Sequence, residues 1–142
     1  MQRTILLILL AGLSLPTVTG ASAADQPVGP AGMLCSTTIA VACRADGECE
    51  SGPAWIWNVP DFIEVDLEAG TLTTAAENPR HRTTPIDVVR RDDGLLLLQG
   101  LENRRAFSIV VAEDVGSLTS AIILEDLVVT VFGSCTSMPA AE

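Results

Sequence analysis

The stretch that decides the fold is residues 86–132, which read IDVVRRDDGLLLLQGLENRRAFSIVVAEDVGSLTSAIILEDLVVTVF. Short apolar runs alternate in it with turn residues such as Asp92-Asp93-Gly94, a strong β-hairpin signal. Phe107, Ile109 and Val111 occupy every second position, which is the period of a strand with one buried face. The stretch therefore predicts antiparallel strands joined by short turns.

The same alternation continues toward the N-terminus as far as Met33. In the first strand, Cys35, Ile39, Val41 and Cys43 share one parity, which predicts that they form its buried face. No segment of ten or more residues has a helical period. The strands are predicted at Met33–Cys43, Phe62–Leu67, Thr71–Ala75, Ile86–Arg90, Leu95–Gln99, Ala106–Val111, Leu118–Leu124 and Leu127–Phe132, with a short one within Trp55–Pro60.

These segments predict an all-β fold, a small antiparallel meander of about eight strands that forms a closed or nearly closed barrel. A two-sheet β-sandwich is the alternative. The segments Arg44–Ala54 and Ala76–Pro85 are expected to be loops, since they hold polar and turn-forming residues. The inward side chains are large enough to fill an eight-stranded barrel and argue against a cavity; they are Ile63, Val65, Leu97, Phe107, Ile109 and Val131.

The N-terminus has the pattern of a secretory signal peptide. Arg3 precedes an apolar run from Ile5 to Leu15, and small residues follow up to Ala23. The run is shorter than the ~20 residues that a transmembrane helix needs. We therefore expect a signal peptide at 1–23 and a single all-β domain at 24–142, with a disordered leader at 24–32. A periplasmic or secreted bacterial protein is expected.

The charge of the chain excludes some partners. Lys and Arg together number 8 against 18 Asp and Glu, and all eight basic residues are Arg. Without Arg3 the mature chain carries seven arginines and a net charge of −11. Such a surface repels phosphate backbones and anionic membranes. We expect neither nucleic-acid binding nor membrane insertion of the mature chain.

The four cysteines are Cys35, Cys43, Cys49 and Cys135, which in an exported chain predict two disulfides with three pairings. Cys35 and Cys43 lie eight residues apart in one predicted strand, ~26 Å at ~3.3 Å per residue. A disulfide needs a Cα separation of ~5.5 Å, so that pairing is excluded. The turn-rich segment between Cys43 and Cys49 folds back easily. The prediction is therefore Cys43–Cys49 with Cys35–Cys135, which ties the first strand to the last.

Catalytic and metal-binding patterns are weak. His81 is the single His, and no serine has the G-x-S-x-G signature of a hydrolase nucleophile. The chain lacks C-x-x-C, and Asp46, Glu48 and Glu50 lack EF-hand spacing. Glu64 and Asp66 share one strand face, which is predicted to face the solvent. We expect no catalytic residue, no metal and no cofactor.

One constellation predicts a binding surface. Successive turns of a meander alternate between the two ends of the barrel, so several long loops meet at one end. Arg and Trp are enriched at binding hot spots, and arginine binds carboxylates and phosphates in a bidentate manner. The candidate binding residues are Trp55, Trp57, Arg80, His81, Arg82, Arg104 and Arg105, with Arg44 at the same end. The alternative is that these arginines form structural ion pairs with nearby acidic residues.

In size and build, a small exported β-barrel with one or two disulfides, the chain resembles the bacterial C-type lysozyme inhibitors. It has no Tyr and no Lys, which the motifs of those inhibitors contain, and no residue role is carried over. The favoured function is a non-enzymatic envelope binding module, an enzyme inhibitor or accessory subunit included, whose partner is an envelope protein or an anionic envelope polymer. The alternatives are a small-ligand carrier that uses the barrel interior and, last, a hydrolase.

Overall fold

The computed structural model describes residues 31–74, 78 and 81–138. The predicted signal peptide and residues 24–30 of the predicted leader lie outside these ranges. The elements are β1 (Gly32–Arg44), β2 (Cys49–Gly52), a 3-10 turn η1 (Ala54–Trp57), β3 (Phe62–Asp66), β4 (Thr71–Thr74), β5 (Thr83–Pro85), β6 (Val88–Asp92), β7 (Leu95–Glu102), β8 (Arg105–Ala112), β9 (Ser117–Ile123) and β10 (Leu127–Ser137).

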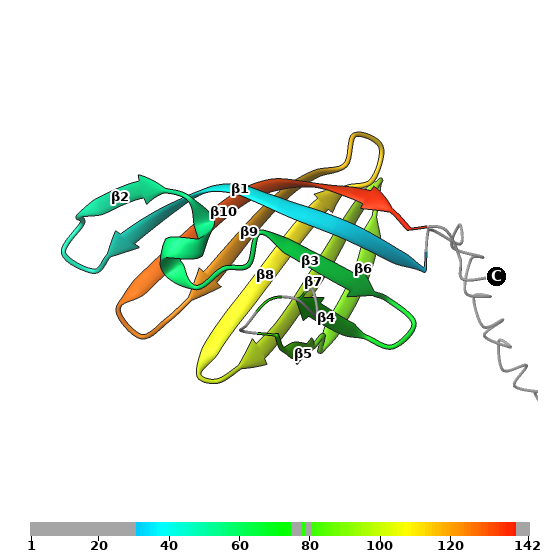
Figure 1. Ribbon diagram of the computed structural model, residues 1–142, viewed down its shortest axis with the longest axis horizontal. Coiled ribbons are helices and arrows are strands. Elements are labelled where there is room, and N and C mark those ends of the chain that lie inside the picture. The colour runs from blue at the N-terminus through cyan, green and yellow to red at the C-terminus, as the bar shows by residue number, and fades with distance from the viewer. Residues whose placement is uncertain (1–30, 75–77, 79–80, 139–142) are drawn as a thin grey trace, which may run out of the picture.

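The ten strands of the described residues join one antiparallel sheet, which curls into a half-barrel (Figure 1). The strand order is β5-β4-β3-β1-β10-β9-β8-β7-β6, and β2 pairs with β1 beyond the end of β3. The first and last strands are neighbours, as predicted. Between β5 and β6, the Ile86 N–H donates to Gly70 O and the Asp87 N–H donates to Gln99 O, both at 2.8 Å. These bonds extend the β4–β5 and β6–β7 pairings, so this short segment links β5 and β6, the two edge strands of the curled sheet.

Two tight hairpin turns set the register of strands β6 to β8. Asp93 and Gly94 have φ values of 46° and 77°, the left-handed pair of a two-residue hairpin turn. The predicted hairpin at this position is confirmed. The next turn is shorter than predicted and consists of Asn103 and Arg104 alone, also with positive φ. Because this turn needs only two residues, β7 and β8 extend until Glu102 pairs with Arg105.

The predicted buried face of β1 is wrong in its second half. The register shifts between Thr37 and Ile39, and this β-bulge reverses which side chains face inward. Before the bulge Cys35 is buried, whereas after it Ala40 is buried and Ile39 is 47% exposed. Gly133 pairs with Thr37 at this point, and a Cβ there would collide with the carbonyl oxygen of Ser36. The missing side chain of glycine thus permits the close approach.

Two segments between β1 and β3 differ from their prediction. The expected loop after Arg44 contains β2, since Cys49–Gly52 folds back to pair with the end of β1. The short strand expected within Trp55–Pro60 is instead the turn η1, which Asn58 ends in a left-handed conformation with φ of 60°. Similarly, β5 forms inside the expected loop Ala76–Pro85, because it finds β4 as a partner. Pairing across the sheet thus decides β2 and β5.

The core has two parts. One lies inside the half-barrel and contains Met33, Cys35, Val65, Leu72, Leu96, Leu98, Ile109, Val111 and Leu118. The other lies beneath η1 and contains Ala40, Ala42, Ala54, Val59, Val129 and Val131. Leu97 was predicted to face inward, but Leu96 and Leu98 do so and are fully buried. Because four leucines follow one another in this strand, the sequence pattern does not show which of them face inward.

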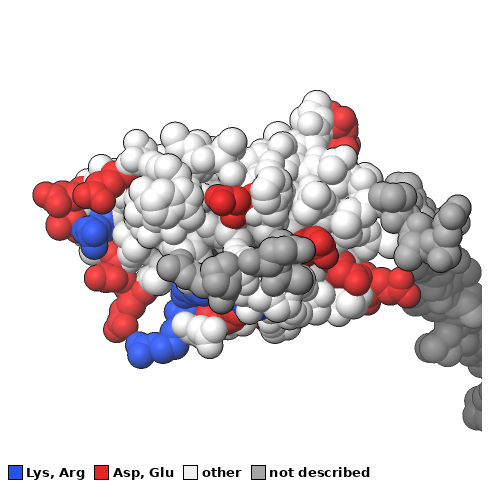
Figure 2. Space-filling model, viewed as in Figure 1, with Lys and Arg blue, Asp and Glu red and all other residues white. Residues whose placement is uncertain are grey.

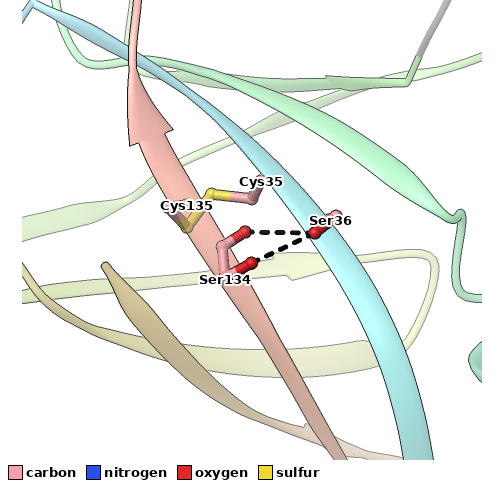
Figure 3. The surroundings of a disulfide bond; sticks show 4 residues. All are labelled: Cys35, Ser36, Ser134 and Cys135. Atoms are coloured by element: carbon pink, nitrogen blue, oxygen red, sulfur yellow. Dashed lines mark hydrogen bonds between the residues drawn. A yellow bond between two sulfur atoms is a disulfide. The ribbon is translucent and has the colours of Figure 1, made fainter. Parts of the chain in front are cut away.

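Both predicted disulfides are confirmed. Cys35–Cys135 joins directly paired positions of β1 and β10, with Cα atoms 3.9 Å apart, and Cys43–Cys49 closes the β1–β2 hairpin. Next to the first bridge, the Ser36 and Ser134 hydroxyls lie 3.3 Å apart (Figure 3). Two disulfides are typical of proteins in an oxidising, non-cytoplasmic location. No helix in the described part of the chain is long and apolar enough to span a membrane.

Candidate functional site

A cavity of about 80 Å³ lies within the half-barrel, contrary to the prediction of a filled interior. The reason is the size of four buried side chains that face it, Thr37, Thr74, Thr84 and Ser120. Each stands where a larger aliphatic residue would fill the space. The remaining lining residues are Val59, Pro60, Ile63, Leu72, Arg82, Glu102, Arg105, Phe107, Ile109, Leu118, Ile122 and Val131.

The hydroxyl groups of the cavity wall fall into two kinds. Thr37 donates to the carbonyl of Pro60 at 2.8 Å, and the Thr74 hydroxyl accepts the Arg82 N–H at 2.8 Å. These two hydrogen bonds position the surrounding backbone. Thr84 and Ser120 are 6% and 7% exposed, and their hydroxyls have no hydrogen-bond partner among the described residues. They are therefore polar groups that a molecule inside the cavity can satisfy.

Three charged side chains meet at the cavity. Glu102 and Arg105 face each other across the β7–β8 hairpin, and Arg82 reaches them from the start of β5. Glu102 Oε2 lies 3.7 Å from Arg82 Nε and 3.6 Å from Arg105 Nη2. The three side chains are 17–27% exposed. Two guanidinium groups thus share one carboxylate oxygen in a partly desolvated place.

The ion pairs of this cluster leave donor capacity. Both contacts to Glu102 are longer than the roughly 2.7–2.9 Å of a charge-assisted hydrogen bond. Arg82 also donates to the carbonyl of Asn58 at 3.4 Å. For Arg105, Glu102 is the single ionic or hydrogen-bonding partner among the described residues. A guanidinium group carries five N–H donors, so most of those on Arg105 are available to a ligand.

The structure brings together Arg82 and Arg105 but distributes the other predicted binding residues around them. Arg104 is fully on the surface, paired with Glu125 at 3.0 Å. His81 Nδ1 lies 2.7 Å from the carbonyl oxygen of Thr74, beside Arg82. Arg80 lies outside the described residues. Figure 2 shows the basic side chains of one face mostly toward the end that carries β2, interspersed with acidic ones.

The tryptophans do not line the cavity. Trp57 packs against the core beneath η1, whereas Trp55 is 59% exposed. Sequence reasoning also missed Glu102, Thr84 and Ser120. Thr84 and Ser120 could have been found as small polar side chains at inward positions of strands. Glu102 could not, because the sequence predicted that it lies in a longer turn rather than at the end of a strand.

Two acidic side chains, Asp46 and Asp66, stabilise turns. Asp46 Oδ1 accepts the N–H of Glu48 at 3.0 Å, and Asp66 Oδ1 accepts those of Glu68 and Ala69. These are turn-stabilising contacts of the Asx type. Within the described residues, no three His, Cys, Asp or Glu side chains are grouped as metal ligands.

Comparison with known proteins adds no further guide, because no family model, curated protein or solved structure matches this chain. The site is therefore defined by its geometry. It combines an apolar interior, two unpartnered hydroxyls and a cationic cluster with unused donors. Such an arrangement can hold a small molecule or group that is anionic at one end.

Proposed function

We propose that this protein is an exported, non-enzymatic binding protein that takes an anion-bearing ligand at the half-barrel cavity. The observation that carries the proposal is the convergence of Arg82 and Arg105 on the single carboxylate of Glu102. The two disulfides and the signal-like N-terminus support export, to the periplasm or the medium.

Electrostatics favour this site over the rest of the surface. The chain has a formal net charge of −10, so an anion is repelled from most of the molecule. At the cavity, Arg82 and Arg105 come together on one carboxylate, and their partial burial strengthens the attraction for an anion. An anion is therefore directed to this cluster.

His81 helps to position the chain next to Arg82. Its Nδ1 atom lies 2.7 Å from the backbone carbonyl of Thr74. We therefore assign His81 a positioning role at the edge of the site.

The experiment is a titration of the oxidised protein with acetate and with inorganic phosphate, followed by NMR chemical shifts. We expect saturable shifts at Arg105 and Ser120 with at least one of these anions. The double variant Arg82→Gln/Arg105→Gln should lose them. Arg90→Gln is the matched control, since Arg90 is an exposed arginine on β6 away from the cavity. Unchanged shifts in the double variant would refute the proposal.

Export is tested on the protein isolated from the cells that produce it. We expect its intact mass to correspond to a chain that begins at Ala24 or Asp25. A chain that retains Met1 would contradict export through cleavage of the signal peptide.

A second candidate function is an interaction module for an envelope protein, such as an enzyme inhibitor or accessory subunit. The observation that favours it is the exposure of two adjacent apolar side chains on η1, Trp55 at 59% and Ile56 at 53%. The Trp55→Ala variant should then no longer capture a protein from envelope extract. Anion binding at the cavity should remain unchanged in this variant, which separates the two functions.

A further inference from the structure

The outer side of the curled sheet has a wide uncharged face. This outer face consists of the outward side chains of residues 39–43 of β1 and of the strands β10, β9, β8 and β7, which follow one another in the sheet (Figure 1). Side chains alternate along each strand, and in the described residues of these five strands no outward side chain is charged. Glu102 and Arg105, at the ends of β7 and β8, line the cavity on the other side.

The strands at the two borders of the outer face have the charges that solvent-exposed strands usually carry. On β3 the outward residues include Glu64 and Asp66, and on β6 they include Arg90 and Asp92, all of them exposed. An uncharged centre with a charged rim is typical of a protein–protein interface, because charged residues are depleted where two surfaces meet.

Apolar side chains cross the outer face in two rows of directly paired positions. One row consists of Ile39, Phe132, Thr119, Val110 and Leu97. The other consists of Val128, Ile123, Ala106 and Leu101. Most of the large side chains in both rows are exposed. Apolar side chains that are exposed together over several strands mark an interaction site rather than a surface for solvent.

Polar groups on this side of the sheet find partners within the sheet. Gln99 Nε2 donates to the Ser108 hydroxyl at 3.3 Å, and the Thr38 hydroxyl donates to the carbonyl of Phe132 at 3.0 Å. A buried polar group is costly only when it lacks a hydrogen bond. A partner that covers these groups therefore does not have to supply hydrogen bonds for them, so the outer face fits an apolar, uncharged surface.

A second copy of this chain offers such a surface. Strand β9, in the middle of the outer face, has small outward side chains, namely Ser117, Thr119 and Ala121. The larger Phe132 and Val110 lie on the strands to either side. In a two-fold pair of sheets, large side chains of each copy can lie over the small ones of the other, so the outer face is complementary to itself.

The size and the charge of the molecule agree with this pairing. Five strands ~4.8 Å apart and about seven residues long make a face of roughly 24 by 23 Å, so two copies bury ~1,100 Å² before side-chain relief is counted. That area exceeds the ~1,000 Å² total of a biological interface. Each copy has a formal net charge of −10, so two copies approach with least repulsion where the surface is uncharged.

We propose that the protein forms a two-fold dimer in which the outer faces of two copies pack against each other. The dimer leaves the cavity free, because Ile109 and Ser120 point into the cavity whereas their neighbours Val110 and Thr119 point outward. Dimer formation is thus independent of the proposed anion binding.

Analytical ultracentrifugation of the oxidised protein, as isolated from the cells that produce it, measures the association. We expect a monomer–dimer equilibrium between about 1 and 200 µM, since interfaces of this size have micromolar or lower dissociation constants. Added sodium chloride should tighten the dimer, because salt screens the repulsion between two acidic copies. A dimer that salt weakens would be held by ion pairs elsewhere on the surface and would overturn the proposal.

Matched variants locate the interface. Phe132→Glu places a charge in the outer face and should raise the dissociation constant at least tenfold. Phe62→Glu is the control, since Phe62 lies on the charged border strand β3 with a similar exposure, 54% against 42% for Phe132, and it should leave the dissociation constant unchanged. In a further variant, Phe132→Thr with Val110→Thr, both new residues are strong strand formers. It should keep the wild-type circular dichroism and also weaken the dimer at least tenfold.

Several results would contradict the dimer. A wild-type protein that stays monomeric up to about 200 µM overturns it, also when the monomer binds neutral phosphatidylcholine vesicles through this face. Growth into species larger than the dimer does the same, because a two-fold pair closes. So does an unchanged dissociation constant in the folded Phe132→Thr/Val110→Thr variant, or an equal loss of affinity in Phe62→Glu and Phe132→Glu.

Discussion

Arg104 occupies the second position of the β7–β8 turn with a φ of 64°, a left-handed conformation that disfavours side chains with a Cβ atom. The turn nevertheless needs positive φ at both central residues, Asn103 and Arg104, to match the twist of its strands. Its side chain is 87% exposed and pairs with Glu125, a contact that solvent screens. The Arg104–Glu125 ion pair therefore adds little stability to offset the free-energy cost of the left-handed backbone conformation.

We expect Arg104→Gly to stabilise the protein by about 0.5–1 kcal/mol, since glycine removes the left-handed penalty and its greater unfolded-state entropy offsets part of the gain. Urea denaturation with both disulfides intact measures this change. Anion binding should stay at the wild-type level, because Arg104 does not line the cavity. A loss of binding in this variant would show that the site is larger than the cavity.

At the scale of the elements, the bulge between Thr37 and Ile39 decides what β1 contributes. Before it, Cys35 faces the half-barrel core and Thr37 faces the cavity; after it, Ala40 faces the core beneath η1. β1 thereby contributes buried side chains to both parts of the core. Gly133 on β10 permits this bulge, because a side chain there meets the backbone of Ser36.

Gly133→Ala should lower the free energy of unfolding by about 1–3 kcal/mol, the typical cost of forcing extra atoms into a packed region. The neighbouring exposed Ser134→Ala is the control and should change stability by less than about 0.5 kcal/mol. Thermal or urea unfolding provides both values. Equal stabilities for the two variants would mean that the strands separate at this point without penalty.

At the scale of the whole molecule, the Cys35–Cys135 bridge joins positions 100 residues apart and links the two ends of the folded chain. The Cys43–Cys49 bridge spans 6 residues within a single hairpin. Loop closure restricts the unfolded chain more when the loop is long, which gives ~4.7 kcal/mol for about 100 residues in the chain-entropy model. The same relation gives roughly 2 kcal/mol for the short loop.

Replacement of both cysteines by serine at positions 35 and 135 should therefore destabilise the protein by about 2–3 kcal/mol more than the same change at positions 43 and 49. Burial adds to the difference, since Cys35 is 1% exposed and a serine there places a hydroxyl in the core. Denaturant unfolding of the two double variants measures it. A larger loss from the short bridge would show that the β1–β2 hairpin, rather than chain closure, limits stability.

The local pattern of the sequence determined eight of the described strands, the Asp93–Gly94 hairpin and, through the signal-like N-terminus and strand geometry, both disulfide pairings. These features depend on neighbouring residues and on the length of the chain between them. Alternation also placed Arg82 and Arg105 at one end of a meander, because successive turns alternate between ends.

Tertiary structure alone decided the bulge in β1, the pairing of β2 and β5, and the cavity with Glu102 between two arginines. Each of these depends on a partner that is distant in the sequence. The bulge needs Gly133 opposite Thr37, and the cavity needs short side chains from several strands to face one another. A one-residue shift in register reverses every later side chain, so no local pattern specifies such a site.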